Sequence, residues 1–359
     1  MRICFFGAWD PAYPRNRILR EGLRRAGAEV LEARVRERRA FRRYPALLAA
    51  FARSARPADV LLVPEFRHKD MPLARWLAGR RRLVFDPLVS RYDTLVADWG
   101  LHAAGSPQAR WNRRLDRWSL SLADLVLCDT WAHGALYESL GVPRARLRRV
   151  LVGAEDAFFT VGATGPPPAP EPVRIVYVGG FLPLHGTRVL VEAVALLERG
   201  AGSLPEFQVE MVGRGIEWKA AREQAERLGV RRISFTGGVP YAEAPRMLAA
   251  AHVVLGAFGA GAKAGRVIPH KVYQGLAAGR AVLTGDGAGL REVCEPGRHL
   301  AAVPRGDPEA LADGLARLVG HPEEREALAR AGRALALEVA TPDRVGASLL
   351  EALAPAGAS

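Results

Sequence analysis

Two basic side chains open an expected helix in the second half of the chain. The segment 259–293, GAGAKAGRVIPHKVYQGLAAGRAVLTGDGAGLREV, predicts a loop of small residues and then a helix. Pro269 suits the first helical position, because its missing N–H would be unpaired there, and the helix should end near Gly279. His270 and Lys271 lie in the first turn, where the helix dipole disfavours cations. Their presence indicates a bound anion, and a diphosphate fits a helix N-terminus.

Gln274 follows Lys271 by three residues and His270 by four, so the three side chains should share one face of the helix. An amide both donates and accepts hydrogen bonds, which suits a sugar hydroxyl.

A glycine-rich turn is the second candidate for ligand contact. The run RIVYVGGFLPLHG predicts a strand that ends in Gly179 and Gly180, with Gly186 after His185. Glycine lets a ligand approach the backbone, and a tight turn is the alternative explanation. The run lacks the G-x-G-x-x-G fingerprint, and the chain has no Walker sequence ending in Gly-Lys-Ser/Thr.

The first half opens with a similar strand, RICFFG, which ends in Gly7. The loop AWDPAYPRNR follows it, and Asp10, Arg15 and Arg17 are candidates for contact with an acceptor or a phosphate. Ordinary loop and helix-cap roles are the alternative for these three residues.

Polar side chains also follow two later strands of the first half. Asp86, Ser90 and Asp93 come just after one strand, where one of them could orient an acceptor hydroxyl or a sugar. After the next strand come three secondary candidates, Asp129, Thr130 and His133. For Thr130, a helix cap is the simpler interpretation.

The elements that must position these residues alternate between strand and helix. Strands are expected at 2–7, 59–64, 82–86, 124–130 and 146–153, and again at 173–180, 207–215, 232–238, 252–259 and 281–286. Helices are expected at 15–27, 71–79, 187–200, 217–229, 241–251, 269–279 and through the tail, 308–354. In the helix at 187–200, Leu190, Ala193, Val194 and Leu197 form one apolar stripe. The predicted fold class is α/β, with two doubly wound Rossmann-like domains whose parallel sheets are covered on both faces.

The linker between the domains is expected at 162–172, GATGPPPAPEP, which is rich in proline and glycine. The first domain then covers 1–161 and the second 173–335. A C-terminal helix at 336–359 is expected to cross back to the first domain.

Composition limits the compartment and the chemistry. The 359 residues contain no apolar run long enough for a membrane span, and the first residues do not form a secretory signal. Cys4, Cys128 and Cys294 are far apart in apolar runs, so neither disulfides nor a metal cluster is expected. These features predict a cytoplasmic protein. Only Lys69, Lys219, Lys263 and Lys271 are lysines, against 51 basic residues in all.

The net charge of +13 is concentrated in arginine clusters of the first third, at 34–44, 67–70, 79–82 and 110–118. Such a field favours a phosphorylated substrate or an anionic membrane surface, and solvated helix faces are the alternative. Nucleic acid is not expected as a partner, since no recognition motif for it is visible. The segment 38–56 could float on a membrane or pack on a sheet.

Four motifs of the second half together resemble a known family. They are the strand with two glycines, a later glycine and a helix at 173–200, then VGRG at 212–215, FTGGVPYAEAPRMLAAAHVVLGAFG at 235–259 and PHKVYQGLAAGRAVLTGD at 269–286. In this order they resemble the donor-binding domain of retaining glycosyltransferases of the GT-B fold, of the large family 4 type (glycosyl transferases group 1). The resemblance covers 173 to about 295, and the first half matches only in architecture.

The resemblance implies a nucleotide-diphosphate sugar as the donor substrate, bound in the cleft across which the two domains face each other, with a first domain that binds the acceptor. Stabilisation of the leaving diphosphate would fall to Gly179, Gly180, His185, Arg266 and Lys271, and binding of the donor also to Gly7, Arg214, His270 and Gln274. Gly237 and Val239 match the segment that lines the base pocket, and 286–292 matches a loop near the sugar or phosphate. Asp86 and Asp93 are the catalytic candidates of the first half.

Two departures from the family pattern affect the phosphate site. The family's usual arginine and lysine of the glycine loop correspond to Gly180 and His185 here, and its paired glutamates correspond to Arg266 and Gln274. Phosphate neutralisation would then pass to His185, Arg266 and Lys271, and Gln274 would keep the ribose contact as an amide.

The mechanism that the resemblance implies is attack by an acceptor hydroxyl with retention of anomeric configuration and no protein nucleophile. The chain has no D-x-D sequence, so no obligatory metal and no cofactor are expected. A lipid-linked acceptor would suit a basic first half and a peripheral position at the inner face of the membrane. Two alternatives are a binding or scaffold protein that has lost catalysis, and a nucleotide-sugar epimerase.

Overall fold

The computed structural model describes residues 1–37, 39–163, 172–200, 202 and 204–354. It forms two units, one made of Met1–Leu151 and Pro342–Ser359 and the other of Val152–Thr341. The chain therefore passes from one unit to the other twice.

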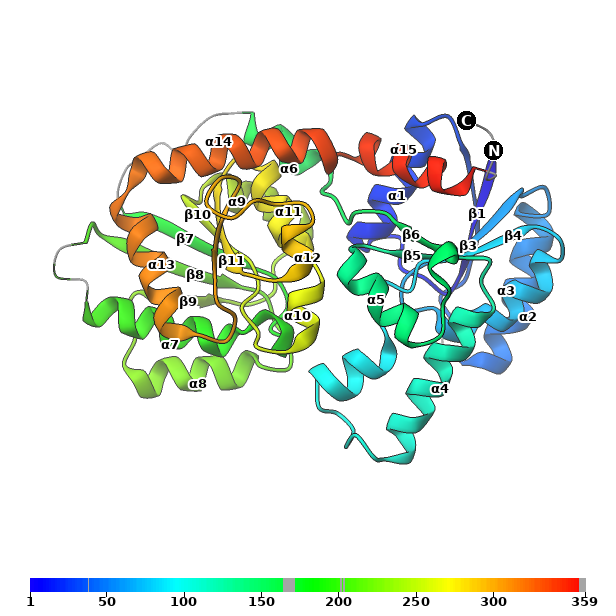
Figure 1. Cartoon of the computed structure of the whole chain (residues 1–359), viewed down its shortest axis with the longest axis horizontal. Helices are drawn as coiled ribbons and strands as arrows, with labels where there is room; N and C mark the ends of the chain where they lie inside the picture. The colour runs from blue at the N-terminus through cyan, green and yellow to red at the C-terminus, as the bar shows by residue number, and fades with distance from the viewer. Residues whose placement is uncertain (38, 164–171, 201, 203, 355–359) are drawn as a thin grey trace. The chain divides into compact units, whose positions relative to one another are not determined.

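The first unit is built on a six-stranded parallel sheet with the strand order β2-β1-β3-β4-β5-β6 (Figure 1). Its strands are β1 (Arg2–Gly7), β2 (Glu29–Arg34), β3 (Val60–Val63), β4 (Arg82–Phe85), β5 (Leu125–Cys128) and β6 (Leu147–Arg149). Successive residues of β1 point to opposite faces: Cys4 and Phe6 lie in one hydrophobic cluster, and Ile3 and Phe5 in another. Both faces of the sheet are therefore buried.

Helices cover both faces of this sheet. They are α1 (Pro14–Arg25), α2 (Ala40–Ser54), α3 (Met71–Ala78), α4 (Pro107–Ser121), α5 (Trp131–Ser139) and the last helix of the chain, α15 (Pro342–Leu353). In α2, Leu47 and Phe51 are buried in the cluster that holds Cys4. Of the two interpretations of segment 38–56, packing on the sheet is the one that the structure shows for this apolar face.

The second unit repeats the plan with the strand order β12-β11-β10-β7-β8-β9. Its strands are β7 (Val173–Val178), β8 (Phe207–Val212), β9 (Ile233–Thr236), β10 (Val253–Leu255), β11 (Ala281–Gly285) and β12 (Ala301–Val303). Its helices are α6 (Asp156–Gly162), α7 (Thr187–Arg199), α8 (Trp218–Leu228), α9 (Ala244–Ala249), α10 (Ala262–Arg266), α11 (His270–Ala277), α12 (Ala288–Arg291), α13 (Pro308–Gly320) and α14 (Pro322–Val339). The predicted class, α/β with two doubly wound Rossmann-like units, is confirmed.

Most predicted elements are present, and the apolar stripe of α7 is buried in the core of the second unit. The prediction missed β2 and β12. The unit boundaries also differ from the predicted ones: α6 lies in the second unit and packs against α9 and α11. Most of the predicted linker, residues 164–171, lies outside the described residues.

Two of the absences expected from composition concern the described residues directly. No helix in the described ranges combines the length and the apolar character that a bilayer span requires. The three cysteines are free and buried.

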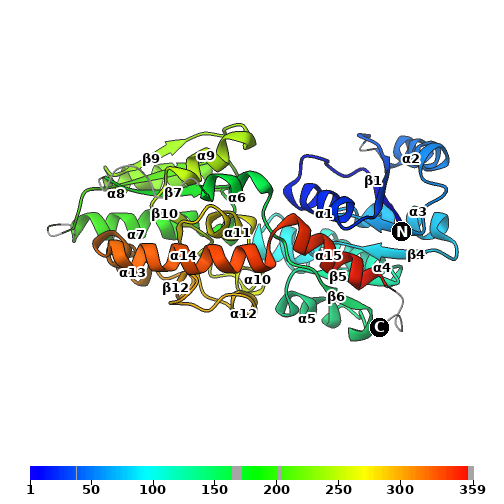
Figure 2. The same cartoon turned by 90° about the horizontal axis from the view of Figure 1, so that it is seen from above.

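The last helix returns to the first unit and lies along α1 (Figures 1 and 2). A glycine on each helix permits this approach. A Cβ on Gly22 would stand 2.0 Å from the carbonyl oxygen of Pro342 and 2.8 Å from Cα of Gly346. Arg25 adds an ion pair to Asp343 at 3.1 Å. The fold of the first unit thus depends on the end of the chain.

Replacement of Gly22 by alanine separates packing from helix propensity. Propensity alone predicts that Gly22→Ala stabilises α1 by about 1 kcal/mol. The contact with α15 predicts the opposite sign, a loss of about 1–3 kcal/mol from overpacking. Denaturant unfolding measures the difference, and Gly105→Ala is the control because nothing lies within 4 Å of its added Cβ. A stabilised Gly22→Ala protein contradicts the close helix contact.

Candidate functional site

The loops after β7 and β10 meet at the carboxyl edge of the second sheet. The chain runs from β7 outward to β9 and then returns to β10 on the other side of β7, so the strand order reverses between β7 and β10. Ligands of doubly wound sheets bind at such a point. Gly186 has φ +62°, and its added Cβ would stand 2.6 Å from the backbone nitrogen of Gly259. Glycine at 186 therefore lets the backbones of the two loops pass close to each other.

The amino group of Lys271 lies under the glycine turn that follows β7. Its Nζ is 3.6 Å from the centre of the Tyr177 ring. A Cβ on Gly179, whose φ is +154°, would be 2.6 Å from this Nζ. The backbone angle favours glycine at 179, and an added Cβ would have to displace the end of the lysine side chain. Lys271 is only 5% exposed, and within the described residues its Nζ has no hydrogen-bond partner.

Burial is the main influence on the pKa values of the two basic groups at this turn, Lys271 and His185. Desolvation lowers the pKa of Lys271 well below its ordinary value. Burial also lowers the pKa of His185, and the charges of Lys271 and Lys263 lower it further. His185 is therefore neutral at physiological pH, with Nδ1 3.0 Å from the Tyr177 hydroxyl and beside the Gly180 carbonyl oxygen. The imidazole thus supplies hydrogen bonds to the site and no charge.

Gln274 is held by a hydrogen-bonded relay. Its Nε2 lies 2.6 Å from the Tyr241 hydroxyl, which lies 2.9 and 3.0 Å from the two carboxylate oxygens of Glu155. A carboxylate only accepts hydrogen bonds, so the single hydroxyl proton goes to Glu155 and the hydroxyl oxygen accepts from Gln274. This arrangement fixes the amide: Nε2 faces Tyr241, and Oε1 is left on the other side as an acceptor.

The predicted base-pocket residues lie close together. A Cβ on Gly237 would stand 3.0 Å from Nη2 of Arg214, so the arginine crosses this glycine. Arg214 is exposed and also lies over the ring of Trp218 at 5.6 Å. Val239 is half-buried. These residues follow β8 and β9, at the same edge of the sheet as Gly179.

The loop 286–292 packs on α10. A Cβ added to Gly287 would stand 2.6 Å from Cα of Gly265. A Cβ added to Gly289 would stand 2.2 Å from the carbonyl oxygen of Arg266. Arg266 and His270 are both half-buried. Pro269 is the N-cap of α11 instead of its first residue, so His270 and Lys271 are the first two helical residues.

In the first unit, the predicted contact loop after β1 is tied to the loop after β3. Gly7 has φ +130°, and its added Cβ would be 3.0 Å from Oδ2 of Asp70. The same oxygen accepts from the backbone N–H of Ala8 at 2.9 Å. Oδ1 of Asp70 pairs with Nε of Arg43 at 2.8 Å. Close approach at Gly7 is thus made by the protein's own carboxylate.

Asp86 forms a buried, two-pronged ion pair with Arg15. The Nε–Oδ2 distance is 2.6 Å and the Nη2–Oδ1 distance is 3.0 Å, with both side chains at most 1% exposed. Arg15 also donates to the carbonyl oxygens of Val150 and Leu151. Both oxygens of Asp86 are therefore engaged in tying three segments together, and its contact with substrate stays a prediction.

The other candidates of the first unit have local partners. Ser90 donates to buried Asp116 at 2.7 Å and accepts from the N–H of Asp93 at 3.0 Å. Asp10 accepts from the N–H of Ala12, and Arg17 is exposed. Thr130 caps α5, which confirms its simpler interpretation. Asp129 and His133 form a buried pair at 2.6 Å.

Several functional candidates were not predicted. Tyr177, Glu155 and Tyr241 are distant from Gln274 or Lys271 in sequence, and no spacing relates them. Lys263 had a signal, because lysine is rare in this chain, and it proves to be 6% exposed. Glu65, just after β3, is 2% exposed, and burial, helped by the charge of Asp86, raises its pKa to about 8.

Part of the second unit is similar to a known family. Residues 172–321 match the family described as Glycosyl transferases group 1. A 130-residue segment is 29% identical to chitobiosyldiphosphodolichol beta-mannosyltransferase of Yarrowia lipolytica, covering 36% of this chain and 28% of that enzyme. The chain thus spans less than a third of that relative.

Solved structures resemble the whole chain. HepE of Anabaena, in complex with UDP and glucose, covers 98% of this chain and 99% of its own at 16% identity, with a TM-score of 0.71. Sucrose-phosphate synthase of Thermosynechococcus elongatus covers 98% of each chain at 16% identity, with a TM-score of 0.72. Likeness at this identity shows a shared fold.

The raised pKa of Glu65 predicts a pH-dependent stability. The folded protein keeps this proton up to about pH 8, whereas the unfolded chain loses it near pH 4.5. Between these values unfolding releases a proton, so the Glu65 contribution to stability falls as pH rises, by at most about 1.4 kcal/mol per pH unit. Glu65→Gln removes this term. The difference between the free energies of unfolding at pH 6 and at pH 8 should be smaller in Glu65→Gln than in wild type. If the unfolding free energy has the same pH dependence in both proteins, the assignment to Glu65 is contradicted.

Proposed function

Because residues 172–321 match the family of group 1 glycosyl transferases and the chain has the GT-B fold, we propose that this protein transfers a sugar from a nucleotide-diphosphate sugar to a hydroxyl acceptor. The donor occupies the edge of the second sheet beside Lys271. Structures of HepE contain UDP and UDP-glucose, which supports a donor of this class.

The observation that carries the proposal is the buried ammonium group of Lys271. An ammonium with no hydrogen-bond partner is costly to bury, and a cation in the first turn of α11 opposes the helix dipole. A diphosphate at the Gly179 turn offsets both costs, because it supplies the missing acceptors and the opposite charge. Lys263, also buried, adds a second positive charge nearby.

The family's missing phosphate ligands are replaced in two ways. His185 is neutral, so it serves as a hydrogen-bonding group and not as a charge. Lys271 and Lys263 carry the neutralisation, with Arg266 at the end of α10 as the third cation. The sequence-based expectation that His185 shares the charge is therefore revised.

Gln274 can perform the acceptor role of the family's glutamate. The relay through Tyr241 to Glu155 turns its Oε1 away from Tyr241 and leaves it to accept a hydrogen bond. A glutamate at this position would offer ribose hydroxyls an acceptor, and the oriented amide offers the same. Loss of the carboxylate is thus compatible with ribose binding.

The proposed chemistry retains the anomeric configuration. The acceptor oxygen attacks the anomeric carbon from the face that the diphosphate leaves, the bond to the diphosphate oxygen breaks, and the departing phosphate takes the acceptor's proton. Lys271 and the backbone N–H groups of the glycine turn stabilise the charge that develops on the diphosphate. Transfer with inverted configuration, read by ¹H NMR of the first product, would contradict this mechanism.

Retention, a glycolipid or cell-surface polysaccharide product and a metal-independent reaction are all part of the proposal. The alternatives are separable by experiment. A protein that binds nucleotide sugars and never turns them over fits the scaffold alternative, and conversion of the donor sugar without any acceptor fits an epimerase.

Nucleotide binding should depend on Lys271 in a diagnostic way. A ligand at a hundred times its Kd adds about 2.7 kcal/mol of stability. We expect one of UDP, GDP, ADP or TDP to raise the wild-type Tm. Lys271→Met should abolish this rise while leaving the free protein as stable as wild type or more so, because an uncompensated buried charge is removed.

The control is Lys219→Met, whose side chain is 87% exposed. It should keep the full nucleotide-induced rise in Tm. A rise that survives in Lys271→Met places the diphosphate elsewhere, and no rise with any nucleotide in wild type favours the scaffold alternative.

The relay predicts a specific loss of ribose recognition. Tyr241→Phe keeps the ring, which packs against Phe158, and frees the Gln274 amide to turn. Affinity for the ribonucleoside diphosphate should fall about tenfold, because the hydrogen bond between a ribose hydroxyl and the oriented Gln274 amide is lost. Affinity for its 2′,3′-dideoxy analogue should not change, and Tyr92→Phe should alter neither. An equal loss for both nucleotides contradicts the relay.

A further inference from the structure

The exposed face of α4 combines four arginines with two tryptophans. Arg110, Arg113, Arg114 and Arg117 are all exposed. Their spacing of three and four residues places them on one side of the helix. Trp111 and Trp118, seven residues apart, are 56% and 49% exposed and border the arginine row.

Within α4, no exposed carboxylate balances this face. Asp116 is the single acidic residue of α4, and it is fully buried on the opposite side. There it accepts hydrogen bonds from the Ser90 hydroxyl and from the backbone N–H groups of Arg91 and Tyr92. Asp116 is thus engaged in holding α4 to residues 90–92, and the outward face of the helix keeps all four positive charges.

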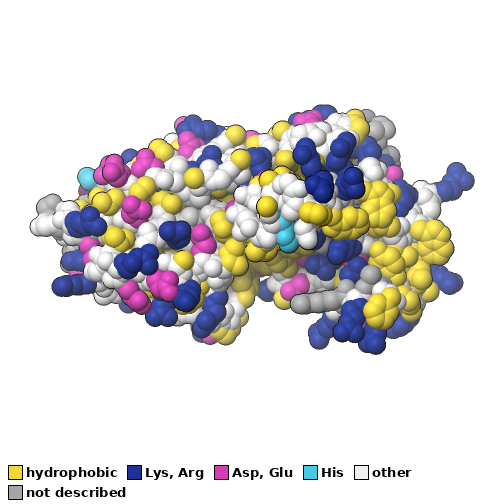
Figure 3. Space-filling model, turned by 90° about the horizontal axis from the view of Figure 1, so that it is seen from below, with side chains coloured by type: hydrophobic (Ala, Val, Ile, Leu, Met, Phe, Trp, Pro, Cys, Tyr) yellow, Lys and Arg dark blue, Asp and Glu magenta, His cyan; other side chains and the backbone are white. Residues whose placement is uncertain are grey.

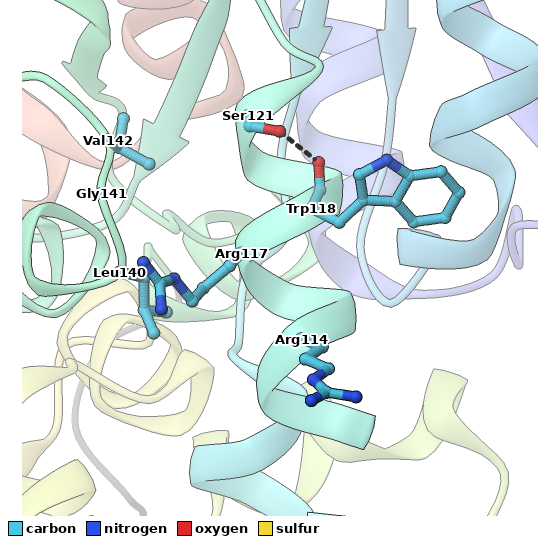
Figure 4. Close-up of a pocket in the computed structure, with 7 residues that line it drawn as sticks. All are labelled: Arg114, Arg117, Trp118, Ser121, Leu140, Gly141 and Val142. Atoms are coloured by element: carbon cyan, nitrogen blue, oxygen red, sulfur yellow. Dashed lines mark hydrogen bonds between the residues drawn. The ribbon is translucent and has the colours of Figure 1, made fainter. Parts of the chain in front are cut away.

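A groove lies beside the arginine row. Its volume is about 450 Å³, and it is lined by Arg114, Arg117, Trp118 and Ser121 of α4 and by Leu140, Gly141 and Val142 after α5. In Figure 4, Arg117 extends from α4 toward Leu140, whereas the indole of Trp118 points away from the 140–142 loop. The groove therefore offers two guanidinium groups to an anion, and the indole reaches out past the other side of the helix.

Exposed aromatic surface is concentrated in this unit. Among the described residues, the large hydrophobic side chains that are exposed include three tryptophans, Trp76, Trp111 and Trp118, all in the first unit. Figure 3, seen from the side on which α4 lies, shows hydrophobic and Lys or Arg side chains gathered over the first unit. Exposed apolar surface mixed with one sign of charge marks an interaction site.

We propose that the outward face of α4 docks this protein onto an anionic lipid bilayer, with lipid phosphates held by the arginines and the groove and with Trp111 and Trp118 inserted at headgroup depth. Tryptophan favours that interface because its ring is apolar and its N–H is polar. Arginine stems cover apolar surface while their heads bind phosphate. The face carries both functions on one helix.

A second copy of the chain fits this face poorly. A twofold contact through α4 would bring the two arginine rows toward each other, and like charges repel. A bilayer with negative headgroups has the complementary charge. The proposal uses only contacts within the first unit, so it stands or falls independently of the nucleotide site.

The test is co-sedimentation of the full chain with vesicles, without nucleotide. We expect binding to phosphatidylcholine vesicles with about 30% phosphatidylglycerol at low salt, weak binding to pure phosphatidylcholine, and loss of binding as salt rises. Each basic residue near such a surface contributes about fivefold. The combined variant Arg110→Gln, Arg113→Gln, Arg114→Gln, Arg117→Gln should therefore have a partition coefficient more than about a hundredfold lower than wild type.

Two matched controls distinguish binding through this face from a general effect of net charge or of exposed apolar surface. The charge control removes the same net charge from exposed arginines of the second unit, by Arg199→Gln, Arg222→Gln, Arg227→Gln and Arg330→Gln. The apolar control, Leu228→Ala with Leu337→Ala, removes exposed apolar side chains of the second unit and is matched to Trp111→Ala with Trp118→Ala. Both controls should bind vesicles nearly as wild type, and the tryptophan variant should lose about tenfold or more.

Three results would overturn the proposal. One is the absence of binding to anionic vesicles at low salt. The second is an equal loss in the charge control, which means that net charge alone drives binding. The third is complete competition: a duplex or single-stranded oligonucleotide, at matched phosphate concentration, abolishes vesicle binding. That result would assign the face to nucleic acid.

Discussion

The candidate site of the second unit is organised around one interaction: an ammonium group packed between an aromatic ring and a glycine turn. Lys271 lies on the Tyr177 ring and leaves no room for a side chain at Gly179. Cation–π attraction compensates part of the desolvation cost, and no hydrogen bond to a described residue completes it. The turn after β7 and the first turn of α11 meet at this amino group, and its charge adds to the burial that keeps His185 neutral. The site is organised for an anion.

The two units treat buried charge in opposite ways. In the first unit Arg15 and Asp86 neutralise each other, and Asp70 pairs with Arg43. Such pairs fix the loops at the carboxyl edge of the first sheet and leave little unsatisfied charge. In the second unit, the buried amino group of Lys271 has no hydrogen-bond partner among the described residues. A buried titratable group with a strongly perturbed pKa marks a candidate ligand site, and Lys271 is such a group at the second edge.

Sequence periodicity predicted the features of the structure that depend on neighbouring residues. The strands and helices around Lys271 followed from periodicity, glycine and proline positions, and the shared face of Lys271 and Gln274 followed from helical spacing. β2 escaped because its exposed positions break the alternation, and β12 has only three residues. The partners Tyr177, Tyr241 and Glu155 could not be predicted, because tertiary packing brings them to the site. The pKa of Glu65 is likewise a property of burial.

The most direct test is the titration of Lys271 by NMR in protein labelled at lysine. The chain has four lysines, so the spectrum is simple, and exposed Lys219 serves as an internal reference. We predict that the pKa of Lys271 is depressed in the free protein and rises when a nucleoside diphosphate binds, because the diphosphate favours the charged form. A pKa that is ordinary in the free protein, or that does not respond to the bound nucleotide, would contradict the account.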